Sequence, residues 1–205
     1  MKIYETATAP NPRRVRMFLA EKGLLEQVEF IQIDIAKGEN LTPEFAAMNP
    51  MKKVPVAVLD DGTALAETMA ICRYAEAAHP DTPKLLGATA KEQALIEQWL
   101  RWIDFYLMTP VGMCFQHTSG YFKDRMNCFP DYGQDCYASA AKFLAFLNEQ
   151  LADKPYLLGD SFTAADINAF CTISFARVIK LRIGDDQPHL QAWFELINQR
   201  PSAQV

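Results

Sequence analysis

The sequence predicts two domains, an α/β domain over residues 1–80 and an all-α helical bundle over residues 89–205. In the first part, short β-prone stretches alternate with helical periodicities, whereas from residue 89 apolar residues recur at helical spacing almost throughout. A proline-rich and turn-rich stretch at 81–88 predicts a linker between them. The chain has 205 residues, half of them apolar, which is enough for two small hydrophobic cores.

The first domain begins with a β-α-β pattern. Residues 2–7 alternate weakly and suit a short strand, and Pro10-Asn11-Pro12 predicts a turn after it. Apolar residues then follow one face of a helix over 13–22, which we expect to end at Gly23. Residues 29–35 alternate cleanly and predict the second strand.

A hairpin is predicted in the middle of the domain. The β-prone runs 54–59 and 63–66 are separated by Asp60-Asp61-Gly62, whose Asp-Gly step supplies the positive φ that a tight turn needs. The two runs should therefore pair antiparallel. Before them, Thr42 followed by Pro43 predicts a short helix with a threonine cap.

Both ends of this hairpin suggest binding chemistry. A cis bond before Pro55 would turn the backbone of Val54 outward, where a peptide-like ligand could pair with it as an added strand. At the other end, Glu67 precedes Thr68, the candidate N-cap of a helix over 69–76. The free N–H groups of that helix could hold a carboxylate. The alternative is a hairpin and a capped helix without a ligand.

The order βαβ-α-ββα is that of a small thioredoxin-like domain. The five cysteines include no Cys-x-x-Cys pair, so a thioredoxin-type redox pair, a zinc site and a disulfide scaffold are all disfavoured. Cys72 and Cys171 lie in apolar helical patterns and are expected to be small buried hydrophobic residues.

The helical domain carries two local signals. We expect its first long helix to bend near Thr109-Pro110. Thr163 can cap the N–H of Asp166 while the Asp166 side chain reaches back, and Phe162 with Ile167 can form a staple around this cap. The second signal is one for folding and not for catalysis.

Charge and hydropathy exclude some classes of protein. The net charge of −5 argues against a non-specific nucleic-acid surface, although Arg13, Arg14 and Arg16 form a local basic cluster. The sequence begins without a signal-peptide pattern, and no apolar run reaches the roughly 18 residues of a membrane span. We therefore expect a cytoplasmic protein with no nucleic-acid partner, no membrane partner and no metal.

Three stretches in this order carry a resemblance to a known family. They are Ala-Pro-Asn-Pro-Arg-Arg-Val-Arg at 9–16, Asn-Pro-Met-Lys-Lys-Val-Pro at 49–55 with Glu67-Thr68, and Gly-Asp-Ser-Phe-Thr-Ala-Ala-Asp-Ile at 159–167. Together they resemble the cytosolic glutathione transferase family over essentially the whole chain. The resemblance implies a two-domain enzyme that takes glutathione as its co-substrate.

The resemblance implies a partner for each polar group of glutathione. The cysteinyl group would pair with the Val54 backbone, and the γ-glutamyl carboxylate and amine would meet Thr68 and Glu67. Lys53, with Asn40 beside it, would meet the glycyl carboxylate, because a buried charge without a partner costs several kcal/mol. The alternative for Lys53 is an ordinary solvated lysine. The glutathione-binding residues implied are Asn40, Lys53, Val54, Pro55, Glu67 and Thr68.

The catalytic position departs from the common pattern of the family. Ala9 stands where many classes have a Ser or Cys that donates to the glutathione sulfur, and the Ala-Pro-Asn turn is similar to the Thr-Pro-Asn turn of bacterial Nu-type members. Asn11 is therefore the expected sulfur-side donor, with Thr8 second. Tyr4, the counterpart of the strand tyrosine used by some animal-type members, is expected to pack in the core instead.

The electrophile is expected against the second domain. Methionine and aromatic residues gather near Thr109-Pro110 and could form an adaptable apolar wall, although the same residues could be bundle core. His117 is not expected to act as a general base, because no fixed partner for it is visible in the sequence. The residues predicted for this wall are Tyr106, Met113, Phe115 and His117.

The function expected from this resemblance is that of a detoxification enzyme. A glutathione thiolate would attack a small hydrophobic electrophile or a disulfide, and conjugation, disulfide reduction and peroxide reduction stay open. The alternative is a non-catalytic binding module of the stringent starvation protein type. The resemblance also implies a homodimer, in which residues 48–51 and the arginines of the first helix would lie near the partner subunit.

Overall fold

The computed structural model describes all residues 1–205 and divides into two compact units. The first unit contains Met1–Leu85 together with Pro201–Val205, and the second contains Leu86–Arg200. The division between Leu85 and Leu86 falls inside the linker predicted at 81–88. The last five residues group with the first unit, whereas the sequence pattern predicts them in the second domain. None of the helices is long and apolar enough to cross a membrane.

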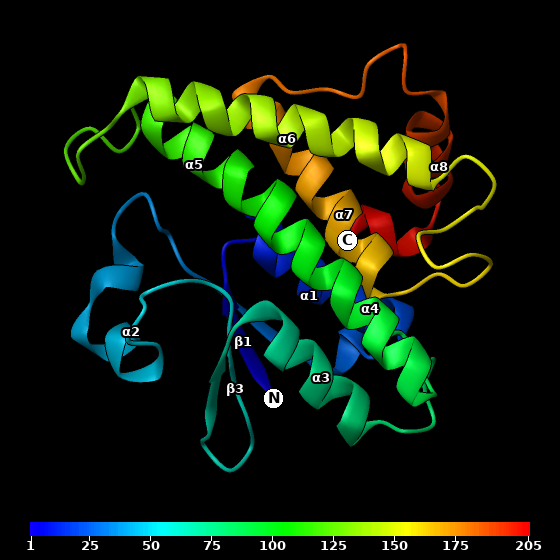
Figure 1. Ribbon diagram of the computed structural model, residues 1–205. Coiled ribbons are helices and arrows are strands. Elements are labelled where there is room, and N and C mark those ends of the chain that lie inside the picture. The colour runs from blue at the N-terminus through cyan, green and yellow to red at the C-terminus, as the bar shows by residue number, and fades with distance from the viewer. The chain divides into compact units, whose positions relative to one another are not determined.

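The first unit contains a four-stranded sheet and three α-helices (Figure 1). Its strands are β1 (Lys2–Glu5), β2 (Glu29–Gln32), β3 (Val56–Val58) and β4 (Ala64–Ala66), and its helices are α1 (Pro10–Glu21), α2 (Pro43–Met48) and α3 (Thr68–Ala78). Short 3₁₀ segments are η1 (Leu25–Gln27), η2 (Glu39–Leu41) and η5 (Pro201–Gln204). The strand order is β2-β1-β3-β4, with β1 and β2 parallel and the other pairs antiparallel. The predicted thioredoxin-like domain with the order βαβ-α-ββα is confirmed.

Local signals account for most element boundaries in this unit. The Thr42 hydroxyl accepts a hydrogen bond of 3.2 Å from the Phe45 N–H at the start of α2, as predicted. Gly62 has φ 86° in the hairpin turn, and Gly23, which follows the Lys22 C-cap of α1, has φ 68°, so that a left-handed residue closes the helix. The strands are shorter at their ends than the sequence pattern predicts.

Two predictions at helix starts are wrong. The Pro10-Asn11-Pro12 stretch is not a separate turn but the first turn of α1, where a missing proline N–H costs nothing because that group has no partner within the helix. Thr68 is the first residue of α3 and not its cap. The cap position belongs to Glu67, whose side chain makes no capping hydrogen bond.

The second unit is a helix bundle, as predicted. Its helices are α4 (Ala90–Ile103), the π-helical segment η3 (Asp104–Met108), α5 (Thr109–Thr118), α6 (Pro130–Gln150), α7 (Ala164–Phe175), the 3₁₀ turn η4 (Ala176–Ile179) and α8 (Pro188–Asn198). Figure 1 shows α4, η3 and α5 as one continuous rod with α6 alongside α5. Ten consecutive residues of α7, 164–173, are buried, so this helix is the centre of the bundle.

A π-helical segment, η3, lies directly before Thr109-Pro110, where the sequence predicts a bend. The Thr109 N–H donates to the carbonyl of Asp104, five residues earlier, so the helix is one residue wider here. Because the proline ring clashes with the carbonyl four residues before it in a regular helix, a wider turn directly before Pro110 accommodates the proline.

The predicted capping box at the start of α7 is confirmed. Asp166 is fully buried and accepts hydrogen bonds from the N–H and hydroxyl of Thr163, from the Leu157 N–H and from the Trp193 ring N–H, at 2.9–3.1 Å. Burial raises the pKa of the Asp166 carboxyl, and these four hydrogen bonds oppose that rise. The Phe162 ring lies against Tyr156 and under the guanidinium of Arg200.

All five cysteines are free thiols. Cys72 and Cys171 are 2% and 1% exposed, which confirms their prediction as small buried hydrophobic residues.

Candidate active site

Strand register brings three loop segments to one end of the sheet. Tyr4 of β1 pairs with Val56 of β3, and Val56 pairs with Ala66 of β4. Because these pairs are antiparallel, β3 enters the sheet where β1 and β4 leave it. Residues 6–9 after β1, residues 49–55 before β3 and Glu67-Thr68 after β4 therefore gather at the same end. The predicted site residues Thr8, 53–55 and 67–68 lie in these segments, and Asn11 follows the first segment in the first turn of α1. Asn40 lies outside them.

The loop after β1 leads into α1 with few main-chain donors. Pro10 and Pro12 have no N–H, and the Arg13 N–H donates to the carbonyl of Ala9 at 3.2 Å. The first turn of α1 therefore leaves the main-chain N–H of Asn11 available to a ligand, beside its side-chain amide. Thr8 is exposed and Asn11 is half-buried. Both residues predicted as donors thus lie at this end of the sheet.

The peptide bond between Val54 and Pro55 is cis, the isomer that the strand-pairing interpretation of this segment requires. Val54 is half-buried, and β3 starts at the second residue after it. Asn49 fixes the segment that precedes this peptide bond. Its side chain is 3% exposed, donates to the Lys53 carbonyl at 2.8 Å and accepts from the Met51 N–H at 3.0 Å. This role of Asn49 was not predicted, although an Asn before a proline favours a turn.

Glu67 has an unusual backbone at the start of α3. Its φ of 73° and ψ of 122° lie in a region that residues with a side chain rarely adopt, at a cost of roughly 1–3 kcal/mol. This conformation leaves the Glu67 carboxylate exposed while Thr68, 8% exposed, begins the helix. The first amides of α3 have no side-chain cap, so they present N–H groups and partial positive charge beside Glu67.

Lys53 and Asn40, the two residues predicted to meet the glycyl carboxylate, are only partly fixed in position. Lys53 is exposed. Asn40 donates one amide hydrogen to the Lys52 carbonyl at 2.8 Å, so it fixes the loop before β3 in addition to any role toward a ligand. Lys52 itself has a positive φ of 55°.

A buried ion pair that the sequence analysis missed lies beneath the loop after β1. Glu5 is fully buried and Arg16 of α1 donates to it through Nε at 2.7 and 3.0 Å and through Nη2 at 2.5 Å. The Arg16 guanidinium also lies 4.0 Å above the centre of the Phe30 ring. This pair explains part of the basic cluster in α1. Arg13 donates to the Ala203 carbonyl, and Arg14 is buried within the subunit. The sequence predicts that both either cover the helix surface or reach toward a partner subunit.

The residues predicted for the electrophile wall fall into separate clusters of the second unit. Tyr106 stacks on Phe143 at 6.2 Å, whereas Phe115 lies among Tyr121, Phe122 and Phe175. His117 is 8% exposed, and its Nδ1 accepts a hydrogen bond of 3.1 Å from the Phe129 N–H. Met113 is half-buried on α5.

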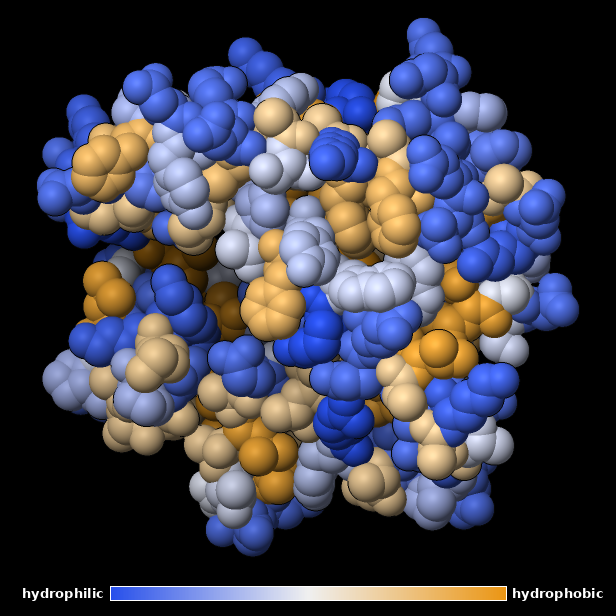
Figure 2. All heavy atoms as spheres, in the orientation of Figure 1, coloured by the Kyte–Doolittle hydropathy of each residue, from blue (hydrophilic) through white to orange (hydrophobic).

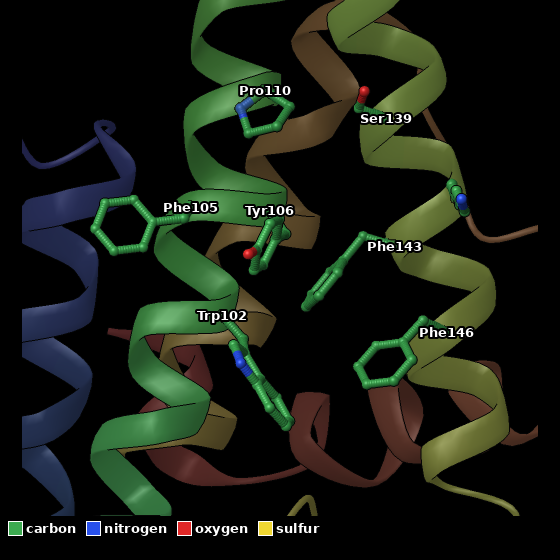
Figure 3. Close-up of a pocket in the computed structure, with 8 residues that line it drawn as sticks. Trp102, Phe105, Tyr106, Pro110, Ser139, Phe143 and Phe146 are labelled. Atoms are coloured by element: carbon green, nitrogen blue, oxygen red, sulfur yellow. The ribbon is translucent and has the colours of Figure 1, made fainter.

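Tyr106 lines an aromatic groove of about 570 Å³ on the second unit. Figure 3 shows the rings of Tyr106, on η3, and Phe143, on α6, facing each other, with Trp102 and Phe146 below them. Phe105 and Tyr106 are 60% and 58% exposed. Figure 2 shows this surface of α5 and α6 with apolar side chains between polar ones. The groove residues are Trp102, Phe105, Tyr106, Pro110, Ser139, Lys142, Phe143 and Phe146.

Comparison with known proteins places the whole chain in one family. The family model "Glutathione S-transferase, N-terminal domain" matches residues 8–78, and the model "Glutathione S-transferase, C-terminal domain" matches residues 134–201. Glutathione S-transferase 2 of Saccharomyces cerevisiae is 36% identical over 204 residues, which cover 98% of this chain and 87% of the yeast protein.

Solved structures agree with this assignment. The crystal structure of Gtt2 from Saccharomyces cerevisiae has a TM-score of 0.94 and 37% identity, covering 100% of this chain and 99% of that one. A glutathione S-transferase domain-containing protein from Marinobacter aquaeolei has a TM-score of 0.94 and 42% identity, covering 98% and 99%. The chain belongs to the glutathione S-transferase family.

Proposed function

We propose that this protein binds glutathione at the loop end of its sheet and activates the thiol for attack on a hydrophobic electrophile or a disulfide. The observation that carries the proposal is the strand register, which gathers the loop after β1, the cis-Pro55 segment and Glu67 at one end of the sheet. A tripeptide with an amine and two carboxylates needs donors and acceptors from several such segments at once.

Each polar group of glutathione has a proposed partner. The cysteinyl group pairs with the Val54 backbone as an added strand. The γ-glutamyl amine meets the Glu67 carboxylate, and the neighbouring carboxylate accepts from Thr68 and from the uncapped amides of α3. Lys53 neutralises the glycyl carboxylate, with Asn40 shaping the loop from which Lys53 extends.

The thiolate requires stabilisation that one amide can supply. A free cysteine thiol has a pKa of about 8.5, and lowering it by about two units requires about 2.7 kcal/mol. A hydrogen bond to a charged group contributes about 1.5–3 kcal/mol, and a helix N-terminus adds about 0.3–1 kcal/mol. Asn11 offers both its side-chain amide and its main-chain N–H, so Ala9 does not rule out activation. Thr8 is the second candidate donor.

Three reactions of the glutathione thiolate are compatible with this site, and disulfide reduction is one of them. Conjugation and peroxide reduction are the other two reactions that the same thiolate could perform. Attack on an electrophilic carbon forms a thioether and expels the leaving group. Attack on a disulfide forms a mixed disulfide and releases a thiolate, and attack on a peroxide forms a sulfenic acid and releases an alcohol. In these last two reactions a second glutathione then reacts with the product to give oxidised glutathione.

Calorimetry with reduced and oxidised glutathione in parallel tests this proposal. We expect the reduced form to bind, and tighter binding of the oxidised form would favour the disulfide reductase activity. The Glu67→Ala/Thr68→Ala variant should bind glutathione at least about 2 kcal/mol more weakly because the charge-assisted contacts are lost. Equal affinity of this variant and the wild type would contradict the site assignment.

We also propose that the protein is a homodimer and that the aromatic groove between the α4–η3–α5 rod and α6 is part of its interface. Dimerisation is typical of the glutathione S-transferase family. Large exposed aromatic side chains such as Phe105 and Tyr106 are enriched in the buried centres of protein interfaces. A second copy of the chain would cover them.

A further inference from the structure

A chain of side-chain contacts connects the buried ion pair of the first unit to the loop that carries the candidate thiolate donors. The Glu5 carboxylate, held by Arg16, also accepts a hydrogen bond of 2.7 Å from Nε2 of Gln32 at the end of β2. The other end of the same amide, Oε1 of Gln32, accepts from the Ala7 N–H at 3.1 Å. Ala7 directly precedes Thr8 in the loop between β1 and α1.

The charge on Glu5 fixes which way the Gln32 amide points. An ionised carboxylate only accepts hydrogen bonds, so the NH₂ end of the amide must face Glu5. The carbonyl end is then left for the Ala7 N–H. Arg16 makes the ionised state of Glu5 tolerable in a fully buried position by supplying three N–H···O contacts.

The start of the loop is also hydrogen-bonded to Ile33, the residue directly after β2. The Thr6 hydroxyl donates to the Ile33 carbonyl at 2.6 Å, and the Ile33 N–H donates to the Glu5 carbonyl at 2.6 Å. The Ala9 N–H in turn donates to the Thr6 carbonyl at 2.9 Å. The tie from Gln32 therefore holds the one loop residue between the Thr6 anchor and Thr8.

We infer that Gln32, oriented by the Glu5–Arg16 ion pair, is a positioning residue for the thiolate site. It holds the Ala7 main chain and thereby sets the direction in which Thr8 and the start of α1, with Asn11, face the sulfur. The inference rests on the proposed function, because it assigns Gln32 to the activation of bound glutathione. Gln32 does not touch glutathione in this proposal, so it should affect the thiol more than the binding affinity.

The test compares Gln32→Met with Glu29→Met. Both replace a polar residue on β2 by methionine, and both sites are exposed, so both variants should fold. Glu29 pairs only with exposed Lys2 at 3.1 Å, a surface contact that contributes little. Neither variant leaves the buried Glu5 carboxylate without Arg16, which substitution of Arg16 would do.

Three quantities are measured for each variant: the pKa of bound glutathione from the ultraviolet absorbance of the thiolate, kcat, and the dissociation constant of glutathione. We expect Gln32→Met to raise that pKa and lower kcat about tenfold, while the dissociation constant changes less than about twofold. Glu29→Met should resemble the wild type in all three. Gln32→Glu keeps an acceptor for Ala7 but sets a second carboxylate against Glu5, and should lose activity like Gln32→Met.

Hydrogen exchange of the Ala7 amide in the glutathione-free protein provides a readout independent of activity. Faster exchange in Gln32→Met than in Glu29→Met is expected. If the two variants have the same thiol pKa and the same kcat, or if Gln32→Met loses kcat and affinity together, the positioning role is overturned. If the wild type does not bind glutathione, the proposed function fails, and not the positioning role alone. If the Ala7 amide exchanges at the same rate in Gln32→Met and Glu29→Met, the hydrogen bond from Ala7 to Gln32 does not hold the loop.

Discussion

Val56 and Ala66 are partners across the antiparallel β3–β4 ladder, and this pair fixes the spacing between the two ends of the candidate glutathione site. Pro55 immediately precedes one partner and Glu67 immediately follows the other. The peptide-pairing backbone and the residue at the start of α3 are therefore held by the same cross-strand pair. Strand register, and not loop conformation alone, determines their relative positions.

Glu67→Gly is expected to separate stability from binding. Glycine adopts positive φ without the steric cost that Glu67 bears at φ 73°, so the free energy of unfolding should rise by about 1 kcal/mol. Glutathione affinity should fall at least about tenfold, because the carboxylate that meets the amine is lost. Urea denaturation and calorimetry measure the two effects. If the variant binds glutathione as tightly as the wild type, the Glu67 side chain has no part in glutathione binding.

Asp166→Ala is expected to destabilise the second unit severely. The buried N–H groups of Leu157, Thr163 and Trp193 would all lose their acceptor, at a cost of about 1–3 kcal/mol each. The free energy of unfolding should therefore fall by at least about 3 kcal/mol in urea denaturation. Asp153→Ala, at an exposed position, is the matched control and should change it by less than about 0.5 kcal/mol. Similar losses in both variants would argue against this role of Asp166.

Short-range signals allowed much of the fold to be predicted. The Asp60-Asp61-Gly62 turn, the Thr42 cap and the Thr163–Asp166 capping box each involve residues within a few positions of one another, so their partners are visible in the sequence. The same holds for the cis-proline segment. Local chemistry of this kind is sufficient to define elements and their order.

The contacts beneath the site could not be predicted, because their partners are far apart in the chain. Glu5 occurs in a weakly alternating strand and looks like a solvent-facing residue, and only the fold brings Arg16 and Gln32 to it. The prediction of a separate turn at the start of α1 is wrong for a different reason. Two prolines indicate a turn in most contexts, yet the first turn of a helix tolerates them because its N–H groups have no helical partners.

Tyr106→Glu is expected to dissociate the proposed dimer. A charge introduced between the rings of the aromatic groove would be buried without a partner in the interface, which costs several kcal/mol. The wild type should sediment at twice the chain mass of 23.1 kDa at micromolar concentration, and the variant should sediment as a monomer. Leu95→Glu on α4, outside the groove, is the control and should stay dimeric. A monomeric wild type would refute the dimer itself.

Asn11→Ala tests the missing hydroxyl at Ala9. The substitution removes the side-chain amide but keeps the main-chain N–H, so it measures the side chain alone. If the amide stabilises the thiolate, the pKa of bound glutathione should rise and turnover should slow about tenfold to a hundredfold, corresponding to about 1.4–2.7 kcal/mol. Binding should change much less, because the proposed carboxylate partners lie on other segments. The titration is followed by thiolate absorbance as pH is varied.

Ala9→Ser is the complementary variant. A hydroxyl close to the sulfur should lower the thiol pKa or leave it unchanged, and in combination with Asn11→Ala it should restore part of the lost activity. If Asn11→Ala leaves the titration midpoint unchanged, the Asn11 side chain does not stabilise the thiolate, and Asn11 serves only as a helix-start residue between two prolines. The donor is then the main-chain N–H of Asn11 or the Thr8 hydroxyl. Thr8→Val keeps the shape of threonine without its hydroxyl and distinguishes these two donors. A shifted titration midpoint in Thr8→Val would identify the Thr8 hydroxyl, and an unchanged midpoint would identify the main-chain N–H of Asn11.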